Sequence, residues 1–186
     1  MDHKTFLKKF FLSILIGLTA SAFFLFYEVS APEIAFRLSP PEVQEIRAEV
    51  FEEIQKDDNQ KITSNRLIIP AIGFDAEIGT NKGMLTHGGW IHELKQNTPK
   101  VIAVHRYGLN LSPDETMKRT LYHVKKLKTQ DEVFLFWNNT MTTYEVKQIF
   151  EGNHLPDINA DELLLYTCTG WNGGKRVFVI LSQKQQ

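Results

Sequence analysis

The sequence contains a single cysteine, Cys168, among its 186 residues. A lone cysteine excludes an intramolecular disulfide and the usual zinc sites that are built from several cysteines. An excess of charge of one sign is also lacking, because 21 Lys and Arg stand against 22 Asp and Glu. A formal net charge of -1 gives the chain no global electrostatic reason to bind nucleic acid. Thirteen phenylalanines and a charged fraction of 23% argue against a disordered chain.

The charges that are present divide the chain into segments. Residues 28–60 carry nine acidic and three basic side chains, whereas the segments on either side are slightly basic. We therefore predict four parts: a cytoplasmic N-terminus (1–9), a transmembrane helix (10–27), an acidic extracytoplasmic stalk that is partly helical (28–60), and one folded domain (61–186).

The predicted transmembrane helix is a run of 18 uncharged residues, Phe10 to Tyr27. As a helix it spans roughly 27 Å, close to the hydrocarbon thickness of a bilayer. Lys8 and Lys9 precede it, so the positive-inside tendency predicts a single-pass plasma-membrane protein whose domain lies outside the cytoplasm. A cleaved signal peptide is the alternative, because Ala20-Ser21-Ala22 resembles a cleavage site. The apolar run continues over residues 23–27, which favours a retained anchor.

The acidic segment contains a helix start signal. Ser39-Pro40-Pro41-Glu42 places a capping residue, prolines and an acid in the order that begins a helix. Apolar side chains then recur at near-helical spacing, at Val43, Ile46, Val50 and Ile54. Two interpretations remain open: a solvated spacer, or a helix whose apolar stripe docks on the domain or on a partner chain.

The domain after Lys61 has the pattern of an all-β fold. Short runs rich in Val, Ile, Phe, Tyr and Thr are separated by turn residues, which is typical of a sandwich or a closed barrel. The predicted strands cover residues 66–70, 72–78, 101–104, 133–137, 142–150, 163–167 and 176–181. Asn138-Asn139 is the predicted turn of a hairpin, and residues 120–128 are predicted to form a short helical turn.

Three reactive side chains lie at the ends of predicted strands. Cys168 ends one strand, His105 follows another, and Arg176 begins the last. A thiol becomes a nucleophile beside a base or a positive charge, and imidazole can return a proton to a leaving amine. A guanidinium can bind the oxyanion of an acyl-transfer intermediate. Together these residues predict a cysteine-dependent acyl-transfer site.

At these residues the sequence resembles the sortases, the membrane-anchored cysteine transpeptidases of bacterial surfaces. The resemblance covers about residues 64–182 and depends on motifs in a fixed order. These are Leu67-Ile68-Ile69-Pro70-Ala71-Ile72, Ala103-Val104-His105-Arg106, the stretch from Leu121 to Val133, Leu165-Tyr166-Thr167-Cys168, and Arg176-Val177-Phe178-Val179. Three positions depart from the family pattern: Val104 replaces a glycine, Leu164 replaces a threonine, and Gln130-Asp131 replaces Gly-Asp.

The resemblance implies an all-β, closed barrel of about seven to eight strands with short helices, preceded by the transmembrane helix and the stalk. It implies Cys168 as nucleophile, His105 as acid and base, and Arg176 as substrate or oxyanion stabiliser. We assign Thr167, Trp171 and Arg106 to substrate binding. The implied partners are a secreted protein with a C-terminal sorting motif and an amine acceptor, either a cell-wall precursor or a pilin lysine.

No cofactor is expected, although calcium was considered because Asp157, Asp161 and Glu162 cluster before the cysteine strand. A transition-metal site at His87, His92 and Glu93 is not expected, because the spacing suits no common pattern. Two alternatives to a sortase-type enzyme stay open. One is a non-catalytic, membrane-tethered β-domain, and the other is an L,D-transpeptidase-type cell-wall enzyme.

Overall fold

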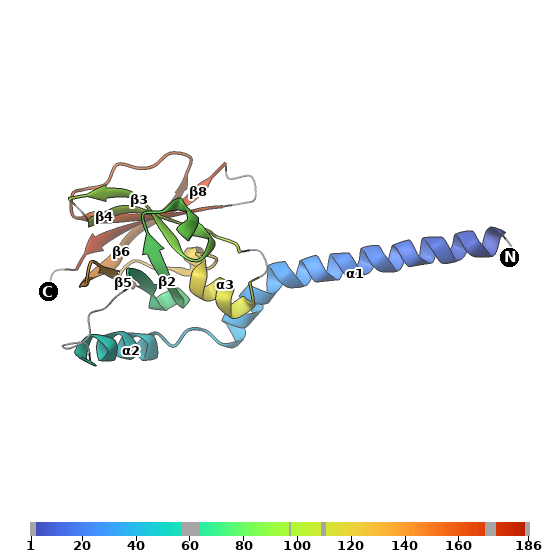
Figure 1. Cartoon of the computed structure of the whole chain (residues 1–186), viewed down its shortest axis with the longest axis horizontal. Helices are drawn as coiled ribbons and strands as arrows, with labels where there is room; N and C mark the ends of the chain where they lie inside the picture. The colour runs from blue at the N-terminus through green and yellow to red at the C-terminus, as the bar shows by residue number, and fades with distance from the viewer. Residues whose placement is uncertain (1–2, 57–63, 97, 109–110, 170–173, 185–186) are drawn as a thin grey trace.

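The computed structural model of the chain describes residues 3–56, 64–96, 98–108, 111–169 and 174–184. Two helices come first, and strands connected by short helical segments follow (Figure 1). The helices are α1 (His3–Leu38), α2 (Val43–Lys56) and α3 (Pro113–Arg119), and the 3-10 segments are η1 (Pro70–Ile72), η2 (Lys82–Thr86) and η3 (Val124–Lys126). The strands are β1 (Arg66–Ile69), β2 (Phe74–Gly79), β3 (Gly89–Lys95), β4 (Thr98–Val104), β5 (Glu132–Trp137), β6 (Thr140–Gly152), β7 (Glu162–Cys168) and β8 (Arg176–Gln183).

The strands close into a barrel in the order β1-β2-β3-β4-β7-β8-β6-β5. The pairs β2–β3 and β4–β7 are parallel, and the other neighbours in the barrel are antiparallel. This arrangement confirms the predicted closed barrel of seven to eight strands and excludes a sandwich. Closure leaves no free sheet edge in the described domain, and it places β7 between β4 and β8.

Alternation along β7 shows which side chains face the barrel interior. Leu163, Leu165 and Thr167 are at most 1% exposed, and both leucines belong to the interior core. Because successive side chains of a strand point to opposite faces, Tyr166 and Cys168 face outward. The barrel therefore buries one face of each strand and leaves the other for covering elements or for a functional site.

Strand β3 and helix α3 were not predicted, and neither were the short segments η1 and η2. Strand β3 was missed because past Ile91 its side chains are exposed and two of them are charged, so it lacks the apolar run of a buried strand. Its first residue, Gly89, faces the interior, where a Cβ would lie 2.9 Å from Cγ2 of Ile78. Helix α3 was missed although Ser112 and Glu115 form a complete capping box, a signal that the sequence did contain.

Two local predictions are confirmed. Asn138 and Asn139 adopt positive φ angles of 49° and 63° between β5 and β6, as a two-residue hairpin turn requires. The predicted turn within residues 120–128 is η3.

Helix α1 projects from the barrel as a long rod (Figure 1). Its stretch from Leu7 to Tyr27 is long and apolar enough to span a membrane, judged by length and composition, and it has no cover within the chain. The helix continues for about three further turns to Leu38, past Pro32, and these turns contact α3.

Helix α2 lies along the outside of β1 and β5. Val50 is only 2% exposed and packs with Ile68, Phe134 and Phe136, while Ile46 lies partly buried beside them. Of the two interpretations for the acidic segment, the structure therefore shows the helix whose apolar stripe docks on the domain. Burial of this stripe stabilises the contact by roughly 1.5–3 kcal/mol for each fully buried side chain.

Candidate functional site

Two parallel strands bring His105 and Cys168 to the same edge of the barrel. Ala103 of β4 pairs with Tyr166 of β7, and the register advances one residue at a time along both strands. Strand β4 ends at Val104, so His105 directly follows it, and Cys168 ends β7 two residues after Tyr166. Neighbouring strands lie about 4.8 Å apart, so the ends of β4 and β7 next to these two residues lie side by side. Both residues are exposed.

The third candidate lies across from the thiol on the next strand. Arg176 is the antiparallel partner of Cys168 in the β7–β8 ladder. Its guanidinium lies 5.4 Å from the ring centroid of Tyr166, which faces outward two residues before the cysteine. Of the three residues that sequence analysis assigned to catalysis, Cys168 and Arg176 are thus paired on β7 and β8, and His105 directly follows β4, the parallel neighbour of β7.

Tyr166 is a site residue that sequence analysis did not single out for a role. Burial raises the pKa of its hydroxyl, the Arg176 charge acts to lower that pKa, and a negative charge on Cys168 acts to raise it. Its ring therefore lies within electrostatic reach of both catalytic candidates. The signal that identifies it is the two-residue alternation of β7, which puts positions 166 and 168 on the same face.

Arg106, assigned above to substrate binding, connects the segment after β4 to the segment after β7. Its Nη1 donates to the carbonyl of Thr169, directly after the cysteine, over 2.9 Å. Its guanidinium also lies 5.4 Å from the ring centroid of Tyr107. The Nε atom is buried and has no hydrogen-bond partner among the described residues. Arg106 therefore fixes the His105 segment against the segment that follows Cys168.

The other two assigned residues are placed differently. Thr167 is 1% exposed and points into the barrel, and its Oγ1 has no hydrogen-bond partner among the described residues. Its side chain is thus on the opposite face of β7 from the thiol. Trp171 lies outside the described residues.

Aromatic side chains form the surface beside the thiol. The ring of Tyr166 lies 6.2 Å from His92 on β3 and also 6.2 Å from Phe178 on β8. Phe178 lies in turn 5.4 Å from Phe150 on β6. Ile158, in the loop between β6 and β7, packs on this outer-face cluster. This cluster crosses β3, β7, β8 and β6 on the face of β7 that also carries Cys168.

Of the three acids considered for calcium, Glu162 makes hydrogen bonds through both of its carboxylate oxygens. Oε1 of Glu162 accepts from Lys147 at 2.5 Å, and Oε2 accepts from the Asn159 N–H at 2.7 Å. The Lys147 hydrogen bond is the main cause that holds the pKa of Glu162 below its ordinary value. Buried Lys100 donates to the carbonyl of Ala160 at 2.8 Å and to those of Asn159 and Glu162. Two lysine ammonium groups thus occupy the oxygen atoms that a metal would need.

Among solved structures, sortases share this fold. Sortase C of Streptococcus pneumoniae matches with a TM-score of 0.53 and 24% identity, over 68% of this chain and 69% of that chain. Sortase C2 of Group B Streptococcus pilus island 1 matches at 0.52 and 23%, over 65% and 73%. Sortase A of Corynebacterium diphtheriae matches at 0.52 and 21%, over 80% and 70%. No protein-family model and no curated protein matches the chain.

These similarities show that the chain has the sortase fold, as its ordered motifs predicted. At identities below 25% they concern the fold alone, so the chemistry has to be argued from the residues at the barrel edge.

Proposed function

We propose that this protein is a membrane-anchored cysteine transpeptidase that cleaves a C-terminal sorting motif and transfers the acyl part to an amine. One observation supports the proposal: Cys168 pairs with Arg176 across β7 and β8, and His105 directly follows β4, which is the parallel neighbour of β7. A nucleophile, an acid and base, and an oxyanion donor are the groups that acyl transfer through a thioester requires.

In the first half-reaction the Cys168 thiolate attacks a backbone carbonyl of the sorting motif, and the carbonyl oxygen becomes an oxyanion. The guanidinium of Arg176, directly across the ladder from the thiol, is placed to stabilise that negative charge. Collapse of the intermediate breaks the C–N bond, and protonated His105 gives its proton to the departing amine. The products are a thioester on Cys168 and a released C-terminal peptide.

In the second half-reaction the amine of the acceptor attacks the thioester carbonyl. Neutral His105 takes the proton from the attacking nitrogen, a new amide bond forms, and the thiolate leaves as the anion that began the cycle. The enzyme returns to its starting state without an external oxidant, reductant or metal ion.

The partners follow from this chemistry. The donor is a secreted protein with a C-terminal sorting motif, and the acceptor is a cell-wall precursor or a pilin lysine. The pneumococcal sortase C that shares this fold is described in terms of pilin substrate specificity. The apolar helix Leu7–Tyr27, with Lys8 and Lys9 at its cytoplasmic end, would hold the barrel on the outer side of the plasma membrane.

The test uses the full chain in detergent micelles, a library of C-terminal peptides, and diglycine as the amine acceptor. Mass spectrometry should find an acyl group on Cys168 and a new amide with diglycine. Cys168→Ala should abolish both products, and His105→Ala should lower turnover by about 10² to 10⁴. Arg176→Ala should lower it by about 10² to 10³. His87→Ala, which removes an exposed histidine beyond these three residues, is the matched control.

Three outcomes would overturn the proposal. A thiol that reacts with iodoacetamide only in denaturant would indicate a non-catalytic tethered domain. Cleavage without transfer to any offered amine would indicate a protease. Equal turnover by the His105→Ala and His87→Ala variants would remove the acid and base from the mechanism.

A further inference from the structure

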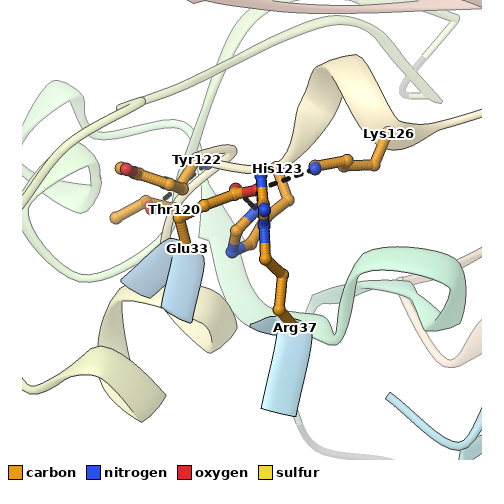
Figure 2. Close-up of polar contacts among 6 residues, drawn as sticks. All are labelled: Glu33, Arg37, Thr120, Tyr122, His123 and Lys126. Atoms are coloured by element: carbon orange, nitrogen blue, oxygen red, sulfur yellow. Dashed lines mark hydrogen bonds and ion pairs between the residues drawn. The ribbon is translucent and has the colours of Figure 1, made fainter. Parts of the chain in front are cut away.

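The extramembrane end of α1 is attached to the barrel through a carboxylate. Oε1 of Glu33 accepts from Nζ of Lys126 over 2.9 Å, although 93 residues separate the two in sequence (Figure 2). The same oxygen accepts from Nε of Arg37, one turn later in α1, also over 2.9 Å. Oε2 lies 3.6 Å from Nδ1 of His123. Glu33 therefore joins the membrane helix to the segment around η3.

An aromatic contact reinforces this attachment. The ring of Phe36, one turn after Glu33, lies 4.1 Å from the imidazole of His123 and is tilted by 32°. His123 is only 3% exposed, and its Nε2 has no hydrogen-bond partner among the described residues. Ala31 and Pro32 are buried in the same region. The end of α1 thus provides part of the cover over a histidine that solvent does not reach.

The segment held by α1 also contacts the catalytic edge. The Leu121 N–H, two residues before His123, donates to the carbonyl of His105 over 2.9 Å. The ring of Tyr122 lies 4.8 Å from His123 and 5.5 Å from Tyr107. Figure 2 shows Tyr122 and His123 beside the α1 carboxylate.

The contacts continue from Tyr107 to the nucleophile. Its ring lies against Arg106, and Arg106 donates to Thr169, which follows Cys168. A series of side-chain and backbone contacts therefore leads from the membrane helix to the His105 segment and to the segment that follows Cys168.

We propose that Glu33 and Phe36 are positioning residues, which act through Lys126 and His123 to hold the His105 segment and the Cys168 segment in their working geometry. The inference rests on the proposed function, because it assigns a role in the reaction of Cys168 and His105. It gives the membrane helix a second task besides anchoring, since its last turns form part of the support of the active site. A catalytic constellation needs such support because errors of about 1 Å in placement can lower rates by about 10².

The experiment compares two lysines that are adjacent in sequence. Lys126 binds Glu33 of α1, whereas Lys125 binds Glu151 of β6. Lys126→Ala and Glu33→Ala remove the attachment, and Lys125→Ala and Arg37→Ala are their matched controls. Lys126→Arg keeps the charge and tests rescue. All variants are measured in the full chain in detergent micelles.

The first measurement is hydrogen exchange at the Leu121 amide, which needs no substrate. Lys126→Ala and Glu33→Ala should accelerate this exchange by about fivefold, which corresponds to about 1 kcal/mol. The Lys125→Ala and Arg37→Ala controls should leave it unchanged. Equal acceleration by Lys125→Ala and Lys126→Ala would overturn the attachment.

The second measurement is the rate at which iodoacetamide alkylates Cys168 as pH is varied. Cys168 is the sole cysteine, so the label reports on one group. If the attachment positions the catalytic pair, Lys126→Ala shifts this pH profile and Lys126→Arg restores it. Faster hydrogen exchange at Leu121 with an unchanged pH profile of Cys168 alkylation would overturn the proposal, because the Glu33–Lys126 contact would then only anchor the helix and would not position the catalytic pair. Failure of peptide transfer in the wild-type chain, with both measurements as expected, would instead count against the proposed function alone.

Discussion

The two helices outside the barrel are attached to it by different forces. Helix α2 packs Val50 into an apolar cluster on β1 and β5, and Arg47 adds one ion pair with Glu132 at its margin. The end of α1 is attached through Glu33, which pairs with Lys126, and through Phe36, which lies on His123. The comparison teaches that one contact is mainly apolar and depends little on pH and salt, whereas the other depends on groups that respond to both.

The largest expected effect is on the apolar contact. Val50→Asp would place a carboxylate among the buried apolar side chains of Ile68, Phe134 and Phe136. We expect the free energy of unfolding to fall by about 3 kcal/mol or more, or α2 to detach from the barrel. Urea unfolding of the full chain in detergent, followed by tryptophan fluorescence, measures the change.

Val43→Asp is the matched control, because Val43 is 38% exposed at the start of the same helix. It should change stability by less than about 0.5 kcal/mol. Equal effects of the two substitutions would mean that α2 does not dock through its apolar stripe.

The next effect is the pH dependence of the polar contact. Burial lowers the pKa of His123 below its ordinary value of 6.5, and the positive charge of Lys126 adds to this while Glu33 and the Pro32 backbone oppose it. Tyr122, with a pKa raised mainly by burial, also faces the imidazole. As pH falls through about 6.5, His123 therefore becomes protonated in the unfolded chain while it is still neutral in the folded chain. Stability is full above pH 6.5 and decreases as pH falls below it, by at most about 1.4 kcal/mol per pH unit.

The pH series should be measured by urea unfolding between pH 7.5 and 5, with His123→Gln for comparison. This pH range stays above 4.5, the ordinary pKa of glutamate. Hydrogen bonds from Lys126 and Arg37 lower the pKa of Glu33 further, so protonation of Glu33 destabilises the protein only at more acidic pH. A His123→Gln curve parallel to that of the wild type would show that another group causes the decrease.

The smallest effect is that of salt on the ion pairs. Lys126 and Glu33 are 43% and 28% exposed, so Lys126→Ala should cost only about 0.5–1 kcal/mol at low salt. Raising the ionic strength to 1 M should reduce this cost, because screening then acts over about 3 Å. The cost of Val50→Asp should remain at both salt concentrations. If the loss of stability in Lys126→Ala does not change with salt, the loss comes from side-chain packing and not from the ion pair with Glu33.

Much of the barrel was predictable because its strands carry local signals. The β7 run, for example, has the apolar character of a strand buried between two neighbours, and the Asn138-Asn139 turn identified the β5–β6 hairpin. Strand β3 was not predictable in this way, since its outer half is polar and its place in the sheet depends on pairing with β4. Tyr166 and Arg106 gain their roles only from neighbours that are far away in sequence.

The sequence by itself determined the apolar helix, the all-β domain and the identities of the reactive groups, because hydrophobic runs, turn residues and side-chain chemistry are local properties. Only the tertiary structure decided that β7 lies between β4 and β8, which pairs Cys168 with Arg176 on one side and places the end of β4, just before His105, on the other. It also decided that Glu33 meets Lys126. Such contacts depend on strand order and helix docking, which result from the packing of the whole chain around one core.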